Sequence, residues 1–202
     1  MFAAVTAILK NTLENALVQQ AATTGVGDAS VSTLPPDRVV TGADERPQLN
    51  LYLYRLTPDT GWKQRMRTDS LAPQQTQELA LKLHYLLSVY SERDFQAEIL
   101  LGVAVQCLQA CTQISNARIG AALDALNLRK SGHATLNALA RSAASTQLEQ
   151  INVMPEFLST EEHAKIWGAF QSHARLSVAY QVSVLLNTSS ANEVQSTLRA
   201  KQ

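Results

Sequence analysis

Three segments of the chain alternate apolar and polar residues with the period of a strand buried on one face. They are Leu49–Leu56, Leu79–Tyr90 and Leu176–Leu186. In the first, Leu49, Leu51 and Leu53 point to one face while Asn50, Tyr52 and Tyr54 point to the other. The first two segments are expected to be antiparallel neighbours, because no helical pattern separates them. A fourth strand is expected at Leu148–Met154 and a short one at Asp37–Val40.

Other segments have the spacing of helices. Residues 2–17 repeat apolar side chains every three to four positions, which predicts an amphipathic first helix. Two sequences resemble helix caps, Ser91–Asp94 and Ser159–Glu162. The first should open a helix to about Thr112 that is apolar nearly all round, and is therefore buried against a sheet, a partner or both. The pattern predicts an α+β fold, a mainly antiparallel sheet of about four strands flanked by helices.

The remaining segments define the expected domain organisation. Thr23–Pro36 is rich in Gly, Ser, Thr and Pro, which predicts a flexible stretch with a stiff end at the two prolines, and Gly25–Ser30 within it is interpreted as a linker. We expect one domain over residues 1–187, with a helical insertion at 118–147 broken near Ser131, and a polar C-terminal arm at 188–202.

Composition excludes several function classes. The chain has 17 basic and 17 acidic residues, and this zero net charge argues against nucleic-acid binding and favours self-association. No apolar run approaches the ~20 residues that span a bilayer, so we expect no direct membrane insertion. The N-terminus lacks the pattern of a signal peptide. Two cysteines, Cys107 and Cys111, exclude a disulfide framework and are interpreted as small core residues, not metal ligands.

Candidate chemistry is sparse. We find no nucleophile elbow or phosphate loop, and predict no catalytic residue, no metal and no cofactor. Tyr52 and Tyr54 either lie under a covering helix or are partly exposed, or they form an interface, where tyrosine is favoured. Lys63, Arg65 and Arg67 beside Trp62 form either a solvated loop or a contact with an acidic protein surface. A small enzyme with a dispersed active site and a peptide-binding adaptor remain alternatives.

The order of these segments resembles a known family. The residues that carry the resemblance are Pro47–Arg55, Leu81–Tyr90, Glu98–Gly102, Leu158–Glu162 with Ile166 and Trp167, and Arg175–Val182. They are similar to the Pvc-sixteen N-terminal domain family, whose members are encoded with phage-tail-like contractile injection particles. The most specific parts are the two strands Leu49–Tyr52 and Leu83–Leu86.

The resemblance implies a structural role without catalysis. Such a protein is similar to a phage tail terminator, a six-subunit ring that ends the inner tube, engages the sheath, and sits at the end opposite the baseplate. It would be made in the cytoplasm and then enter the particle. A closed ring requires two different matching patches on each subunit. We expect Tyr52, Tyr54 and His84 in one patch, and Lys63, Arg65 and Arg67 in contact with tube or sheath.

Overall fold

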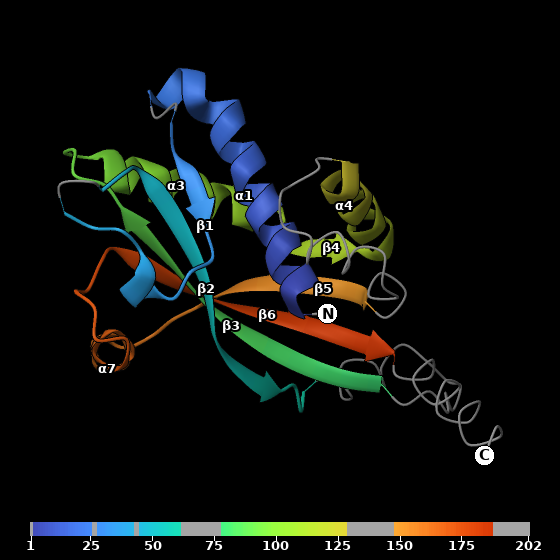
Figure 1. Cartoon of the computed structure of the whole chain (residues 1–202). Helices are drawn as coiled ribbons and strands as arrows, with labels where there is room; N and C mark the ends of the chain where they lie inside the picture. The colour runs from blue at the N-terminus through green and yellow to red at the C-terminus, as the bar shows by residue number, and fades with distance from the viewer. Residues whose placement is uncertain (1, 26–27, 43–44, 62–77, 129–147, 188–202) are drawn as a thin grey trace, which may run out of the picture.

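The computed structural model describes residues 2–25, 28–42, 45–61, 78–128 and 148–187. A curled sheet has most helices packed on one face, here called the inner face, and one helix on its opposite, outer face (Figure 1). The elements in chain order are α1 (Phe2–Thr24), β1 (Ser30–Ser32), a 3-10 helix (Pro36–Arg38), β2 (Gln48–Pro58), β3 (Glu78–Tyr90), α3 (Gln96–Ala110), β4 (Gln113–Ser115), α4 (Asn116–Leu128), β5 (Leu148–Glu156), α7 (Thr160–Ala169) and β6 (Ser177–Asn187).

The six strands of the described residues lie in the order β1-β2-β3-β6-β5-β4. Every pair is antiparallel except β1 with β2, which is parallel. The α+β class is confirmed, and the four central strands are those that the sequence predicts. The sequence predicts about four strands, because it does not reveal the edge strands β1 and β4. Each has three residues, too few for alternation to be visible.

Two local predictions around β1 are wrong. The stretch Thr23–Pro36, in which no strand was expected, contains β1, which pairs with Gln48–Asn50. The strand proposed at Asp37–Val40 is instead the 3-10 turn, in which Arg38 N donates to Pro35 O at 2.9 Å. The two prolines explain the turn: their fixed φ suits the start of a helical turn, and Pro36 has no N–H for a sheet.

The core fills the inner face of the sheet. Alternate residues of the central strands pack there against α1, α3 and α4, as the pattern predicts. Helix α3 buries Leu100, Val103, Ala104 and Leu108 on one side. Helix α3 therefore packs against the sheet, which is one of the two partners that the sequence predicts for it.

Of the two predicted caps, only the second is correct. Ser159 Oγ accepts from Glu162 N at 3.2 Å, and the Glu162 carboxylate accepts from Ser159 N at 2.9 Å. The first helix begins later than expected, at Gln96, after Phe95 in a left-handed conformation with φ 60° and without a side-chain cap. Ser91 instead accepts from Arg93 N at 3.2 Å and bonds the Gln96 side chain, which forms a turn before the helix.

Candidate interaction surfaces

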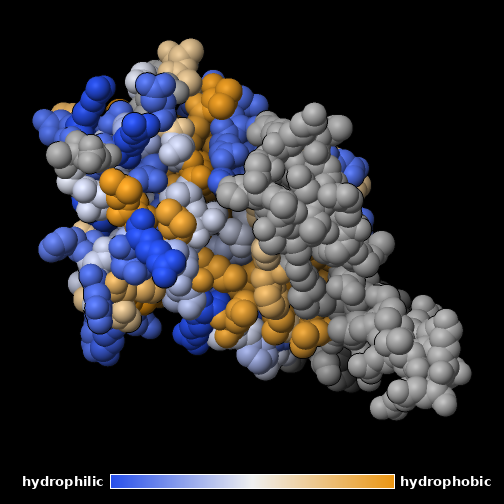
Figure 2. Space-filling model, in the orientation of Figure 1, coloured by the Kyte–Doolittle hydropathy of each residue, from blue (hydrophilic) through white to orange (hydrophobic). Residues whose placement is uncertain are grey.

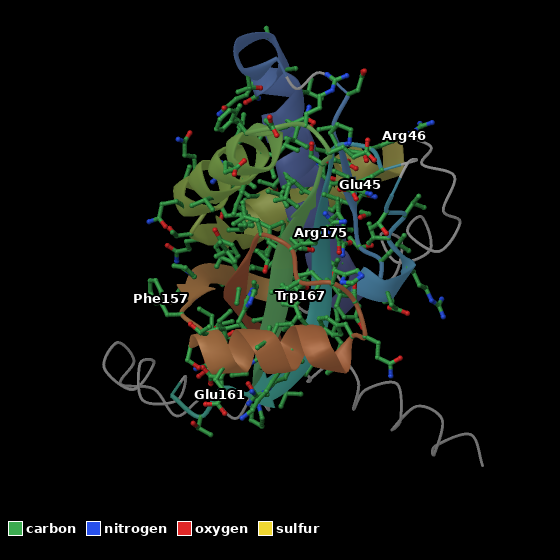
Figure 3. The ribbon with its side chains drawn as sticks, turned by 90° about the vertical axis from the view of Figure 1, so that its left-hand side faces the viewer. Glu45, Arg46, Phe157, Glu161, Trp167 and Arg175 are labelled. Atoms are coloured by element: carbon green, nitrogen blue, oxygen red, sulfur yellow. The ribbon has the colours of Figure 1, made fainter. Side chains whose placement is uncertain are left out.

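The outer face of the sheet carries Tyr52, Tyr54 and His84, three residues for which the sequence predicts an interface. Helix α7 crosses this face (Figure 3). Where it ends, Phe170 meets Tyr52 of β2 edge-on, with ring centroids 5.5 Å apart and planes at 79°. Tyr52 is half-buried by this contact. The covering helix that was one interpretation of this tyrosine is therefore present.

Helix α7 is held to the sheet by a buried indole. Trp167 is buried and stacks edge-on against Phe170 at 6.3 Å. Its Nε1 donates to His163 Nε2 at 3.2 Å, and His163 Nε2 lies 2.7 Å from Ser177 Oγ at the start of β6. Because the indole N–H has hydrogen-bond partners, this large aromatic side chain is buried without leaving a polar group unsatisfied.

A second polar cluster lies on the outer face of the sheet. His84 of β3 is only 4% exposed. Its Nδ1 lies 2.8 Å from Glu156 Oε2, and its Nε2 lies 2.8 Å from Thr57 Oγ1. An ionised carboxylate only accepts, so Nδ1 carries the proton that it donates to Glu156. Both ring nitrogens thus have partners, as a buried imidazole requires.

Tyr54 joins this cluster through an irregularity in β2. The register shifts between Leu53 and Arg55, so Tyr54 is the extra residue of a bulge. Its ring tilts against His84 at 6.2 Å, and its hydroxyl donates a long bond of 3.5 Å to Glu156. Burial, reinforced by the nearby Glu156 charge, raises the pKa of Tyr54 to about 12.

The Thr57–His84–Glu156 row has the hydroxyl–imidazole–carboxylate order of a hydrolase relay. Its imidazole, however, is buried, and the carboxylate is shared with a tyrosine whose raised pKa keeps it neutral. The geometry accounts fully for a satisfied internal network that ties β2, β3 and β5 together. We therefore assign this row to the stability of the sheet.

The structure brings together three of the six predicted interface residues. Tyr52, Tyr54 and His84 share the outer face, and their role in a partner contact stays a prediction. Lys63, Arg65 and Arg67 lie outside the described residues. Sequence reasoning missed Thr57, Glu156 and Phe170. Glu156 and Phe170 contact residues 72 and 118 positions away, and no local pattern signals such a partner.

Large apolar side chains are also exposed elsewhere among the described residues. Phe157, between β5 and α7, is 93% exposed. The uncovered side of α3 presents Phe95, Ile99 and Val105. At the far end of the β2–β3 pair, Leu56 and Leu79 are partly exposed, and Figure 2 shows apolar side chains gathered over this lower part of the sheet. Clustered apolar exposure of this kind marks contact surfaces.

An ion pair fixes the connection between β1 and β2 to the rest of the protein. Arg175, just before β6, donates to Glu45 Oε2 at 2.8 Å, and the Glu45 side chain is only 3% exposed. The guanidinium also lies 5.5 Å from the centroid of the Tyr90 ring. Burial raises the pKa of Tyr90, which stays neutral beside the cation.

Cys107 on α3 and Cys111 just after it are half-buried, so neither is the core residue that the sequence predicts. Cys107 Sγ lies 3.6 Å from Thr12 O of α1, and burial raises the pKa of its thiol to about 11. Within the described ranges, no group of three or more His, Cys, Asp or Glu is placed to hold a metal ion. No helix in the described part of the chain is long and apolar enough to cross a bilayer.

Comparisons with known proteins give matches to solved structures and to one family. A search of curated protein sequences found no match. The sheath/tube terminator of the extracellular contractile injection system PVC, in its extended state, is 15% identical with a TM-score of 0.47, over 87% of this chain and 55% of that one. The tube-terminating cap of the anti-feeding prophage is 16% identical with a TM-score of 0.47, over 86% of this chain and 53% of that one.

The chain thus spans about half the length of the solved proteins it matches. The family match is more extensive, since the model described as the Pvc16 N-terminal domain matches residues 4–199. That range includes every described strand and nearly all of α1, together with the segments on which the sequence resemblance rests. The chain therefore belongs to the Pvc16 N-terminal domain family.

Proposed function

We propose that this chain is a structural cap, or tail terminator, of a contractile injection particle. The observation that carries the proposal is the family match over residues 4–199. The sequence resemblance to this family implies a ring that ends the tube of such a particle. In this role the protein ends the inner tube, engages the sheath and has no enzymatic activity. It is made in the cytoplasm and resides in the particle at the end opposite the baseplate.

The fold supports such a role in two ways. The conspicuous hydroxyl–imidazole–carboxylate row is internal, so its chemistry is used in holding three strands together. The large exposed apolar side chains lie instead at separate places around the sheet, as a subunit with several neighbours requires.

The assembly is proposed to be a homohexameric ring. The outer-face patch with Tyr52, Tyr54 and His84 is offered as part of one contact, in which the half-buried tyrosines would meet the partner and the buried His84 would support Tyr54. The basic segment with Lys63, Arg65 and Arg67 is offered as the contact with tube or sheath. Replacing Arg65 and Arg67 with Glu should then reduce incorporation into particles while leaving thermal unfolding of the isolated subunit unchanged. Unchanged incorporation would remove this segment from the proposed contact.

Deleting the gene tests the whole proposal. Electron microscopy of the resulting particles should show tubes of irregular length or sheaths that contract prematurely. Complementation with the wild-type chain, labelled by a small tag, should restore uniform length and place the label at the end opposite the baseplate. Uniform, stable particles without the protein would refute the cap function.

A further inference from the structure

Three buried oxygen atoms on the outer face of the sheet have no hydrogen-bond partner. Among the described residues four buried side-chain oxygens lack one, and three of the four are Glu45 Oε1, Ser88 Oγ and Tyr90 Oη. The Glu45 side chain is 3% exposed, and Ser88 and Tyr90 are 0% and 1% exposed. Buried polar atoms of folded proteins are nearly always bonded to protein or to ordered water. Three such atoms in one place therefore indicate a shared partner.

Strand pairing and charge place the three side chains together. Ser88 and Tyr90 are two positions apart on β3, so both point to the outer face. Glu45 comes three residues before Gln48, the residue of β2 that pairs with Tyr90. Burial raises the pKa of the Tyr90 phenol, the Ser88 side chain lowers it, and the Glu45 charge raises it further. Both neighbours thus act on the phenol over a short distance.

The polar side chains beside this cluster are directed to other atoms. Asn50 lies opposite Ser88 in the β2–β3 pair. Its side-chain oxygen accepts from Ser32 Oγ at 2.9 Å, and its nitrogen donates to a backbone carbonyl at 2.9 Å. Arg175 donates at 2.8 Å to Glu45 Oε2, the other oxygen of the carboxylate (Figure 3). The three unpaired oxygens are therefore available to a molecule that is not part of the chain.

The charges around the cluster select a small neutral ligand. The Glu45 carboxylate repels an anion, and the Arg175 guanidinium already balances that carboxylate, so a cation gains little. A carboxylate oxygen only accepts, whereas a hydroxyl both donates and accepts. Water can donate to the carboxylate and bond both hydroxyls, and about three hydrogen bonds are typical of a buried water. We propose that one buried water molecule bridges Glu45 Oε1, Ser88 Oγ and Tyr90 Oη.

This water site joins three separate parts of the chain. Glu45 belongs to the connection from β1 to β2, the two hydroxyls belong to β3, and Arg175 precedes β6. The water extends the Arg175–Glu45 ion pair to β3, where Val89 N already donates to Leu176 O at 3.0 Å. Both oxygens of the buried carboxylate are then satisfied. The site is independent of the proposed cap function, and its failure would leave that proposal unchanged.

A crystal structure of the full chain that resolves ordered water tests the site directly. We expect one water molecule at ~2.5–3.0 Å from each of the three oxygen atoms. A direct hydrogen bond between the Ser88 and Tyr90 hydroxyls with no water beside them would overturn the proposal. A metal ion in the same place would also overturn it, because the argument from charge would then be wrong.

Tyr90→Phe tests the bridge in solution, because it removes one bond to the water and keeps the ring. The folding equilibrium constant from urea denaturation should fall about fivefold, the size of one net hydrogen bond. The matched control is Tyr85→Phe, since the buried Tyr85 hydroxyl lies 2.9 Å from Thr6 Oγ1 and its loss should have a similar effect. A loss in the control with an unchanged or higher constant for Tyr90→Phe would show that the Tyr90 hydroxyl is unbonded, and the bridge would be refuted.

Discussion

The His84–Glu156 pair should contribute measurably to folding because both side chains lie in a largely dry part of the sheet. Replacing His84 with Ala removes a charge-assisted hydrogen bond to Glu156 and a second bond to Thr57. Charge-assisted bonds contribute roughly 1.5–3 kcal/mol and neutral ones about 1 kcal/mol. We therefore expect the free energy of unfolding to fall by about 3 kcal/mol. The Glu156 side chain is 23% exposed, so part of its charge can turn to water and limit the loss.

A double-mutant cycle isolates the pair from the loss of packing. The coupling between His84→Ala and Glu156→Ala should be about 2 kcal/mol, measured by urea denaturation followed by circular dichroism. The matched control is the surface pair Lys165–Glu161, whose side chains are 73% and 78% exposed. Solvent screens such pairs, so its coupling should not exceed about 0.5 kcal/mol. Equal coupling in both cycles would refute the assignment of His84 to a buried stabilising network.

Three further predictions concern other contacts. Arg175→Ala should lower the free energy of unfolding by about 2–4 kcal/mol, because it leaves the buried Glu45 carboxylate unpaired; Arg175→Lys, which keeps the charge, should cost less in the same urea titration. The phenol of Tyr54 has a pKa of 10 in the unfolded chain and of about 12 in the folded one. The stability that this difference contributes is present below pH 10 and is lost as the pH rises toward 12. Tyr54→Phe should therefore flatten the fall in the free energy of unfolding over this range. Ser159→Ala should cost about 1 kcal/mol through loss of the helix cap, whereas Ser159→Asp should retain most of it.

Alternation predicts which face each strand residue occupies, and this part of the fold follows from the sequence. Leu49 and Leu51 are buried on the inner face, and Tyr52 points to the outer one. Pleating fixes this assignment locally, since a slip by one residue would place every leucine on the wrong face. The bulge at Tyr54 does not follow from the pattern, because the extra residue is visible only against the pairing of β3.

Which outer-face residues are covered could not be predicted. Tyr52 is covered because α7 ends above it with Phe170, and the direction of α7 depends on where β5 ends. Glu156 is part of the polar cluster because it is the last residue of β5, just after Pro155. Its sequence neighbourhood gives no sign of His84, since the two residues are brought together by β6, which lies between β3 and β5 in the sheet. Long-range contacts of this kind depend on topology.

Helix α7 and the segment after it are held to the rest of the protein at two places. Trp167 of the helix is buried, and Arg175, which follows the helix, binds Glu45 in the connection from β1 to β2. These anchors fix the outer-face helix relative to that connection, which lies at one edge of the strand order. The ring proposed above requires a constant angle between the two contacts of each subunit, because small angular errors accumulate around a closed ring. Loss of the Arg175–Glu45 pair is therefore expected to loosen a subunit of such a ring as well as to lower its stability.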